Sequence, residues 1–169
     1  MGKLRASLGS ALFFVVAPGT VAGFVPWWIT HWQLAPLPHG LAALRWLGIA
    51  LILVGLGPLV ASFARFAWHG LGTPAPIAAP TRLVVSGFYA RVRNPMYVAV
   101  LVILLGEAML FADLRLFLWA AAFWLLTHLF VLLYEERALS RRFGGDYDDY
   151  RANVPRWIPR LVAWTPPSD

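Results

Sequence analysis

Four long apolar stretches, separated by short polar or charged segments, form the main pattern of this chain. A helix rises about 1.5 Å per residue, so about 20 apolar residues cross the roughly 30 Å hydrocarbon core of a bilayer. Each stretch reaches that length, and the pattern therefore predicts an all-α, polytopic membrane protein with four transmembrane helices. The predicted spans cover residues 8–30, 46–64, 94–112 and 116–134.

Two of the predicted spans contain residues that disturb a uniform apolar helix. Pro18, Gly19 and Gly23 interrupt the first span and predict a kink. Glu107 lies within the third span, and an acid inside a bilayer is costly unless it has a partner. We expect Glu107 to find such a partner inside the helix bundle and to serve the structure.

The basic residues are distributed unevenly around the predicted spans. If the N-terminus is cytoplasmic, all of the 14 Lys and Arg residues except Arg45 and Arg115 lie on the cytoplasmic side. An excess of Lys and Arg marks the cytoplasmic loops of membrane proteins, so both termini are predicted to be cytoplasmic. Because these residues flank spans, we expect them to contact membrane lipids and not nucleic acid.

The composition excludes several other classes of protein. Hydrophobic residues make up 60% of the 169 residues and charged residues 13%, against about 45–50% and about 25% in globular chains. That balance argues against a soluble domain and against disorder. The chain has no cysteine, which excludes disulfides, a cysteine nucleophile and thiolate ligands for a metal. We expect residues 1–169 to form a single membrane-embedded domain without a metal site.

Two cytoplasmic segments remain to carry any chemistry. Residues 67–93 are rich in proline and glycine and are predicted to form a loop at the membrane interface. Residues 135–160 begin as a continuation of the fourth span, with a helix C-cap predicted near Gly144 and Gly145. The sequence therefore predicts a helical C-terminal segment and a loop on the same side of the membrane.

The third span begins with a sequence suited to bind an anion. Asn94 is predicted to cap the helix with its side chain, and Pro95 suits the first helical position. The start of a helix carries about half a positive charge, and Arg91 and Arg93 stand beside it. These features suit a carboxylate or a phosphate, while the alternative is that the arginines only anchor the helix in the membrane.

Glu135 and Glu136 follow the fourth span, and two acids at the membrane edge are costly. One interpretation is that they pair with Arg93, Arg137 or Arg141. Another is that they face a cationic ligand, together with Tyr89 and Tyr97. Combined with the anion site at Asn94, the second interpretation suits a ligand that carries both a carboxylate and positive centres.

Two stretches of the sequence resemble a known family of enzymes. The first is LVVSGFYARVRNPMYVAV, and the second, nearer the C-terminus, is YEERALSRRFGGDYDDYRANVPRWIPR. They carry the motifs G-x-Y, R-N-P-x-Y, a pair of glutamates, F-G-x-x-Y-x-x-Y and V-P. This combination resembles the integral-membrane methyltransferases that use S-adenosylmethionine, namely the isoprenylcysteine carboxyl methyltransferases and the phospholipid N-methyltransferases.

The resemblance implies a cofactor and the residues that bind it. S-adenosylmethionine would lie in a pocket that faces the cytoplasm, between the last two spans and the C-terminal segment. The residues that correspond to the family's cofactor contacts are Thr81, Arg82, Leu83, Val84, Tyr89, Asn94, Pro95, Met96, Tyr97 and Glu135. This agrees with the ligand expected from the residues alone, since S-adenosylmethionine has a carboxylate, an ammonium and a sulfonium.

The sequence constrains the methyl acceptor less than the cofactor. Arg93 and Arg156 are candidates to hold a lipid phosphate, and His128 and Glu136 are candidate catalytic residues that could deprotonate or hold an acceptor amine. His128 could also be a packing histidine. The prenylcysteine enzymes carry an arginine one turn before the glutamate pair, where this chain has Val131. We therefore expect a lipid or other hydrophobic acceptor, with a lipid amine favoured over a carboxylate.

Three other functions stay open at this point. The first is carboxyl methylation of an isoprenylcysteine-type acceptor. The second is a membrane reductase, because sterol reductases have a similar arrangement of catalytic helices, although four spans are few for such an enzyme. The third is a membrane scaffold without enzymatic activity. Binding of S-adenosylmethionine would separate the methyltransferases from the reductase and the scaffold.

Overall fold

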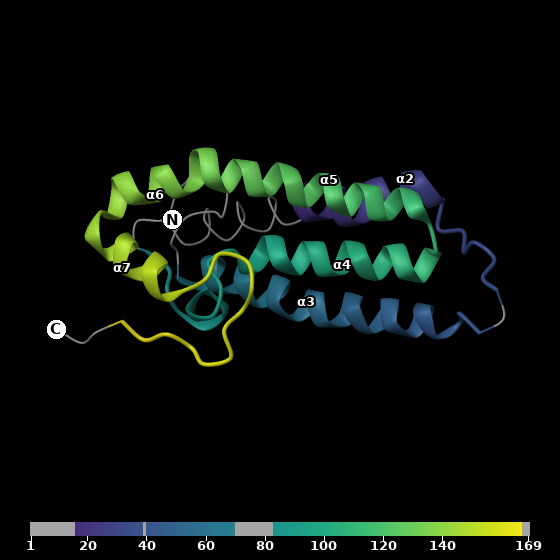
Figure 1. Ribbon diagram of the computed structural model, residues 1–169, viewed down its shortest axis with the longest axis horizontal. Coiled ribbons are helices and arrows are strands. Elements are labelled where there is room, and N and C mark those ends of the chain that lie inside the picture. Colours follow the sequence, from purple (N-terminus) through teal and green to yellow (C-terminus); the bar gives the residue numbers. More distant parts are fainter. Residues whose placement is uncertain (1–15, 39, 70–82, 167–169) are drawn as a thin grey trace.

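The computed structural model describes residues 16–38, 40–69 and 83–166, and this part of the chain contains helices and loops but no strand. Figure 1 shows α3, α4 and α5 side by side, with α6 continuing α5 and α7 turning back below it. The elements are η1 (Thr20–Phe24), α2 (Val25–Thr30), α3 (Ala43–His69), η3 (Gly87–Ala90), α4 (Pro95–Phe111), α5 (Leu114–Phe130), η4 (Val131–Glu135), α6 (Glu136–Phe143) and α7 (Gly145–Asn153). The all-helical fold class is confirmed for the described residues.

Two helices of this structure are long and apolar enough to cross a membrane. One comprises Ala43–Arg65 of α3, and the other is the continuous helix Leu114–Phe143 formed by α5, η4 and α6. α4 is apolar but shorter, and the predicted first span begins outside the described residues. The topology of four spans with cytoplasmic termini therefore stays a prediction.

The observed helix boundaries differ from the apolar pattern mainly at α3. This helix ends at His69, so residues 67–69, for which the sequence predicts a loop, are helical. Arg65 ends the apolar run of the second predicted span but lies inside α3. A charged residue can therefore end an apolar run without ending the helix. The C-cap prediction is confirmed, because α6 ends at Phe143 and Gly144 follows with a positive φ of 54°.

The first helix is distorted by a π-helical turn. Residues 16–19 are α-helical and lead into η1, which begins directly after Pro18 and Gly19. A π turn disturbs the regular backbone pairing of a helix. Here Trp119 of α5 donates a hydrogen bond from Nε1 to the Val21 carbonyl oxygen at 3.0 Å. The residues for which the sequence predicts a kink therefore lie in and next to a π turn. The hydrogen bond from Trp119 of α5 stabilises this turn.

α3 and α4 approach each other closely because glycines face each other at the contact. A Cβ atom at Gly48 would lie 2.5 Å from the Gly106 carbonyl oxygen, and a Cβ atom at Gly106 would lie 2.6 Å from the Gly48 carbonyl oxygen. A Cβ atom at Gly55 would lie 2.8 Å from the Ala99 carbonyl oxygen. Small residues allow membrane helices to pack backbone against backbone, so these glycines fix α4 against α3.

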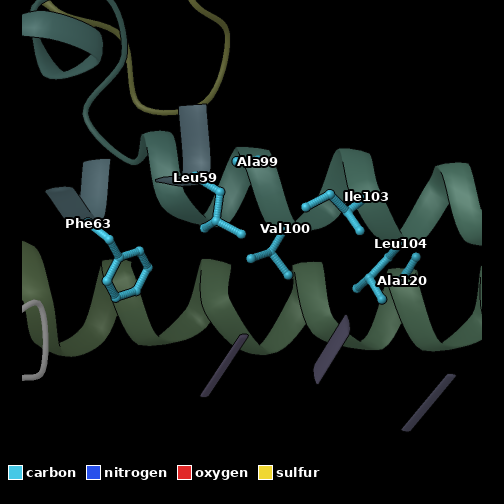
Figure 2. Close-up of a cluster of buried hydrophobic side chains, with 7 residues drawn as sticks. All are labelled: Leu59, Phe63, Ala99, Val100, Ile103, Leu104 and Ala120. Atoms are coloured by element: carbon cyan, nitrogen blue, oxygen red, sulfur yellow. The ribbon is translucent and has the colours of Figure 1, made fainter. Parts of the chain in front are cut away.

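The main core lies where α3, α4 and α5 meet. Figure 2 shows Leu59 of α3 close to Val100 of α4, Phe63 of α3 farther to the left, and Leu104 of α4 next to Ala120 of α5. All five side chains belong to one buried cluster. Leu59, Phe63 and Val100 also line a cavity described below, so the core of the bundle forms one wall of the candidate site.

A second, smaller core attaches the C-terminal segment to the loop before α4. Tyr147, Tyr150 and Val154 are buried there against Leu83, Val85 and Trp164. Backbone bonds support the contact, because Arg93 N donates to the Pro155 carbonyl at 2.9 Å. The two segments that carry the candidate chemistry are thus held together away from the main core.

Among the residues that the structure describes, Glu107 does not have the internal partner that its position in the span led us to expect. Its exposed fraction is 6%, and its Oε2 atom has no hydrogen-bond partner among the described residues. The neighbouring buried residues on α4 include Leu104, Ala108 and Phe111, which are apolar. The expectation of a polar partner is therefore wrong for the part of the chain that the structure describes.

Candidate active site

The loop before α4 begins with a glycine that no other residue could replace without strain. Gly87 has a φ of 67°, and a Cβ atom there would lie 2.7 Å from Nη2 of Arg65. Arg65 of α3 also donates from Nη1 to Ser86 Oγ at 2.8 Å. The short helix η3 that follows carries Tyr89, so the glycine of the G-x-Y motif lets this tyrosine sit next to the end of α3.

Asn94 stands at the start of α4 but does not cap it with its side chain. No side-chain capping bond is formed, and Asn94 instead donates from Nδ2 to the Arg156 carbonyl oxygen at 3.2 Å. The prediction of a side-chain cap is therefore wrong, and the Asn94 amide instead ties the start of α4 to the C-terminal segment. Pro95 occupies the first position of the helix as predicted.

Glu135 and Glu136 are adjacent in sequence but contact different partners. Glu135 accepts a hydrogen bond at Oε2 from the Tyr97 hydroxyl at 3.3 Å. Glu136 instead contacts Arg93 and Arg156. The π-helical turn η4 ends at Glu135, and π turns often occur at functional sites. One carboxylate therefore faces α4 while the next faces the arginines.

Glu136 joins two arginines that come from distant segments. Arg93 Nη1 lies 2.8 Å from Glu136 Oε1, and Arg156 Nε lies 2.6 Å from the same oxygen. A second bond runs from Arg156 Nη2 to Oε2 at 2.9 Å, and it is part of the reason why the pKa of Arg156 is raised. Arg93 also donates to the Tyr147 hydroxyl at 3.3 Å. Of the pairings considered from sequence, that with Arg93 is observed, and Arg156 joins it.

A cavity of about 210 Å³ lies where these segments meet. Its walls come from the first helix, α3, the loop before α4, the start of α4, the helix that runs from α5 into α6, and α7. The lining residues are Ala17, Pro18, Val21, Leu59, Phe63, Leu83, Val84, Tyr89, Arg93, Asn94, Pro95, Met96, Tyr97, Val100, Phe123, Glu135, Leu139 and Tyr150.

The cavity brings together the residues that the family resemblance points to. Eight of the ten expected cofactor contacts line it, namely Leu83, Val84, Tyr89, Asn94, Pro95, Met96, Tyr97 and Glu135. The other two, Thr81 and Arg82, lie outside the described residues. Burial, and next the nearby charge of Glu135, raise the pKa of Tyr89 well above its ordinary value. Tyr89 is therefore a neutral phenol at physiological pH.

The candidate acceptor residues are placed less uniformly. Arg93 lines the cavity, whereas Arg156 and Glu136 stand behind it and are not among the lining residues. His128 is also absent from the lining, and its Nδ1 atom accepts a hydrogen bond from Trp157 Nε1 at 3.0 Å. Its ring stacks on Trp124 with centroids 5.1 Å apart. These contacts fit a packing histidine better than a base for an acceptor.

Several lining residues were not singled out from the sequence. Tyr150 lines the cavity and donates from its hydroxyl to the Tyr89 carbonyl oxygen at 2.7 Å. The motif F-G-x-x-Y-x-x-Y contains this tyrosine, so its spacing could have identified it. Val21, Leu59 and Phe123 come from apolar spans, and nothing in an apolar pattern distinguishes a cavity wall from a lipid-facing side chain.

Comparison with known proteins gives two matches. The family model described as phospholipid methyltransferase matches residues 43–146. The nickel-cobalt-cadmium resistance protein NccN of Alcaligenes xylosoxydans xylosoxydans is 32% identical over 117 residues, which cover 69% of this chain and 53% of that protein. The chain thus spans about half the length of the curated relative it matches. Among the described residues, no group of three or more His, Asp and Glu residues could hold a metal ion.

Proposed function

The chain belongs to the phospholipid methyltransferase family, and we propose that it transfers a methyl group from S-adenosylmethionine to a lipid or other hydrophobic acceptor at the cytoplasmic membrane face. The observation that carries this proposal is the cavity in which eight expected cofactor contacts meet. They come from two stretches that are distant in the sequence, 83–97 and 135. We propose that the whole described chain forms one membrane-embedded domain around this cavity.

The charged groups of the cavity fit a ligand with both charges. Glu135 accepts a hydrogen bond from the neutral phenol of Tyr97, so its carboxylate suits an ammonium or a sulfonium. Arg93 lines the cavity, and its buried Nε atom has no hydrogen-bond partner among the described residues. A buried donor without a partner is costly, and a ligand carboxylate would satisfy it. S-adenosylmethionine offers all of these groups.

Methyl transfer asks little of the side chains themselves. The cofactor supplies a methyl group that its sulfonium has already activated. The protein has to align the acceptor with that methyl group and exclude water. Val21, Leu59 and Phe123 contribute apolar side chains to the wall of the cavity. Such a wall suits an acceptor that arrives from the hydrocarbon of the bilayer.

We propose a lipid amine as the acceptor, in preference to a carboxylate. A carboxylate in an apolar pocket needs a cationic partner. Arg93 lines the cavity, but it is paired with Glu136 at 2.8 Å through Nη1, and in this proposal its Nε atom is used by the carboxylate of the cofactor. Val131, at the position where the prenylcysteine enzymes carry an arginine, is buried with an exposed fraction of 1%. An amine has no need of such a partner, and Glu135 contributes a negative charge to the same cavity.

Competition between two acceptors tests this proposal. Membranes that contain the protein are incubated with labelled S-adenosylmethionine, phosphatidylethanolamine and a prenylcysteine analogue. We expect label in the phospholipid, because the amine fits the charge of the cavity. Label in the prenylcysteine ester alone would overturn the choice of amine, and transfer to neither, together with no binding of S-adenosylmethionine, would favour a scaffold.

Replacing Glu135 with glutamine is expected to weaken binding of S-adenosylmethionine. The change keeps the size of the side chain but removes the negative charge that faces the cavity. Loss of a charge-assisted bond costs about 1.5–3 kcal/mol, which corresponds to roughly a 10- to 100-fold higher Kd. Titration calorimetry on the detergent-solubilised protein measures this directly. Asp148→Asn, which removes an exposed acid that does not line the cavity, is the control and should leave binding unchanged. Equal affinity of Glu135→Gln and the parent protein would remove Glu135 from the cofactor site.

We also propose four membrane spans with both termini in the cytoplasm, from the asymmetry of Lys and Arg across the spans. A reporter that is active only in the cytoplasm is expected to be active when fused after Asp169. A reporter that is active only outside the cytoplasm, fused at the same position, is the matched control and is expected to be silent. Activity of the second reporter instead of the first would reverse the orientation.

A further inference from the structure

The segment after α7 exposes three large apolar side chains. Ile158 is 79% exposed, Leu161 is 92% exposed and Val162 is 73% exposed. They belong to residues 154–166, which form no helix. Apolar side chains stabilise a structure by leaving water, and a cluster of them on a surface marks an interaction site.

The backbone of this segment is held in place from several sides. Arg160 N donates to the Arg91 carbonyl at 2.9 Å, and Trp164 N donates to the Ala90 carbonyl at 2.8 Å. Arg160 Nη1 bonds the Asn153 carbonyl at 2.7 Å, and Arg91 Nη1 bonds the Leu161 carbonyl. The three apolar side chains therefore project from a fixed loop and are not the accidental outward positions of a loose tail.

The same bonds place the loop near the level at which the helices enter the membrane. Ala90 and Arg91 come just before α4, which begins at Pro95. Figure 1 shows the C-terminal segment, in yellow, curling beside the end of α3 and the start of α4. A side chain that projects there would meet the boundary between lipid headgroups and acyl chains.

The charge of the segment suits the same surroundings. Residues 154–166 contain Arg156 and Arg160 and no acid, and Arg91 lies against them. Basic residues beside exposed apolar side chains are typical of segments that lie in the interface of a membrane, because the headgroups there carry phosphate.

We propose that Ile158, Leu161 and Val162 insert into the interface of the membrane leaflet nearest the cavity, with Arg91 and Arg160 beside lipid phosphates. The loop is then an interfacial anchor. It fixes the C-terminal segment to the membrane surface, and with it Arg156, which bonds Glu136 behind the cavity. The inference depends on the proposed membrane spans and does not depend on the cofactor or the acceptor.

Depth-dependent fluorescence quenching tests this anchor, and the absence of cysteine from the chain makes it direct. Leu161→Cys is labelled with an environment-sensitive fluorophore in the full chain, reconstituted in vesicles of phosphatidylcholine and phosphatidylglycerol. The vesicles carry a spin label either at the headgroup or near the end of the acyl chain. Leu118→Cys on α5, 64% exposed, is the control for a lipid-facing position, and Asp149→Cys on the exposed side of α7 is the control for water.

We expect the probe at residue 161 to be quenched more by the headgroup label than by the chain-end label, with a blue-shifted emission relative to the probe at residue 149. Quenching at 118 combined with none at 161 would overturn the anchor alone. Absence of quenching at both positions would overturn the spans as well. A blue shift at 161 without any quenching would point to a protein surface and would also overturn the proposal.

Discussion

Replacing Glu136 with glutamine is expected to lower the free energy of unfolding by about 3–5 kcal/mol, because the change leaves two arginines without their counter-charge. The side chains of Glu136 and Arg93 are only 15% and 11% exposed, so water replaces the lost carboxylate poorly there. Arg156 is 29% exposed and is partly relieved by solvent. Most of the loss should therefore come from Arg93.

Thermal unfolding in detergent measures this loss, and the chain offers a matched control. Arg151 and Asp148 form an ion pair whose side chains are 50% and 51% exposed. Exposed pairs of this kind contribute about 0–1 kcal/mol, so Asp148→Asn should leave the melting temperature almost unchanged. If Glu136→Gln proved as mild as Asp148→Asn, the ion pair behind the cavity would not hold the C-terminal segment in place.

The two neighbouring glutamates should then give opposite results. Glu135→Gln is expected to weaken cofactor binding with little loss of stability, since its partner Tyr97 is a neutral phenol. Glu136→Gln is expected to lower stability first and binding less. The difference arises because consecutive residues of a helix project about 100° apart, so Glu135 contacts Tyr97 while Glu136 contacts Arg93 and Arg156.

The sequence predicted the helices of this bundle better than the contacts between them. Uncharged apolar runs located α4 and the start of α5 to within two residues, because a membrane helix has to remain apolar along its length. The end of α3 was missed, since a helix can continue past a charged residue into the interface. The residues that cross the membrane are therefore not always all the residues of the helix.

The candidate site was predictable where local motifs encode it and unpredictable where distant segments meet. The R-N-P-x-Y motif located Asn94 and Tyr97, and both line the cavity. The prediction that the Asn94 side chain caps α4 was wrong, because its amide bonds the carbonyl of Arg156, which lies far along the chain. The Trp157 bond that occupies His128 is long-range for the same reason. Such pairings depend on where α7 places the segment that follows it, and no local sequence pattern predicts that position.

The contact between α3 and α4 should be the most sensitive position in the membrane part of the protein. Gly48→Ala adds one methyl group that would lie 2.5 Å from the Gly106 carbonyl oxygen and 2.7 Å from the Leu110 nitrogen. Both atoms belong to the backbone of α4, so the helices have to separate. Overpacking of this kind costs about 1–3 kcal/mol, and more when the backbone has to move.

Gly57→Ala on the same helix is the matched substitution, because a Cβ atom at Gly57 would meet nothing within 4 Å. Alanine is a better helix former than glycine by up to about 1 kcal/mol, so Gly57→Ala should be neutral or stabilising while Gly48→Ala destabilises. Thermal unfolding of the two variants side by side removes the helix propensity from the comparison. Equal melting temperatures would mean that the two helices do not pack through Gly48 and Gly106. The start of α4, with Asn94 and Tyr97, would then need another support against α3.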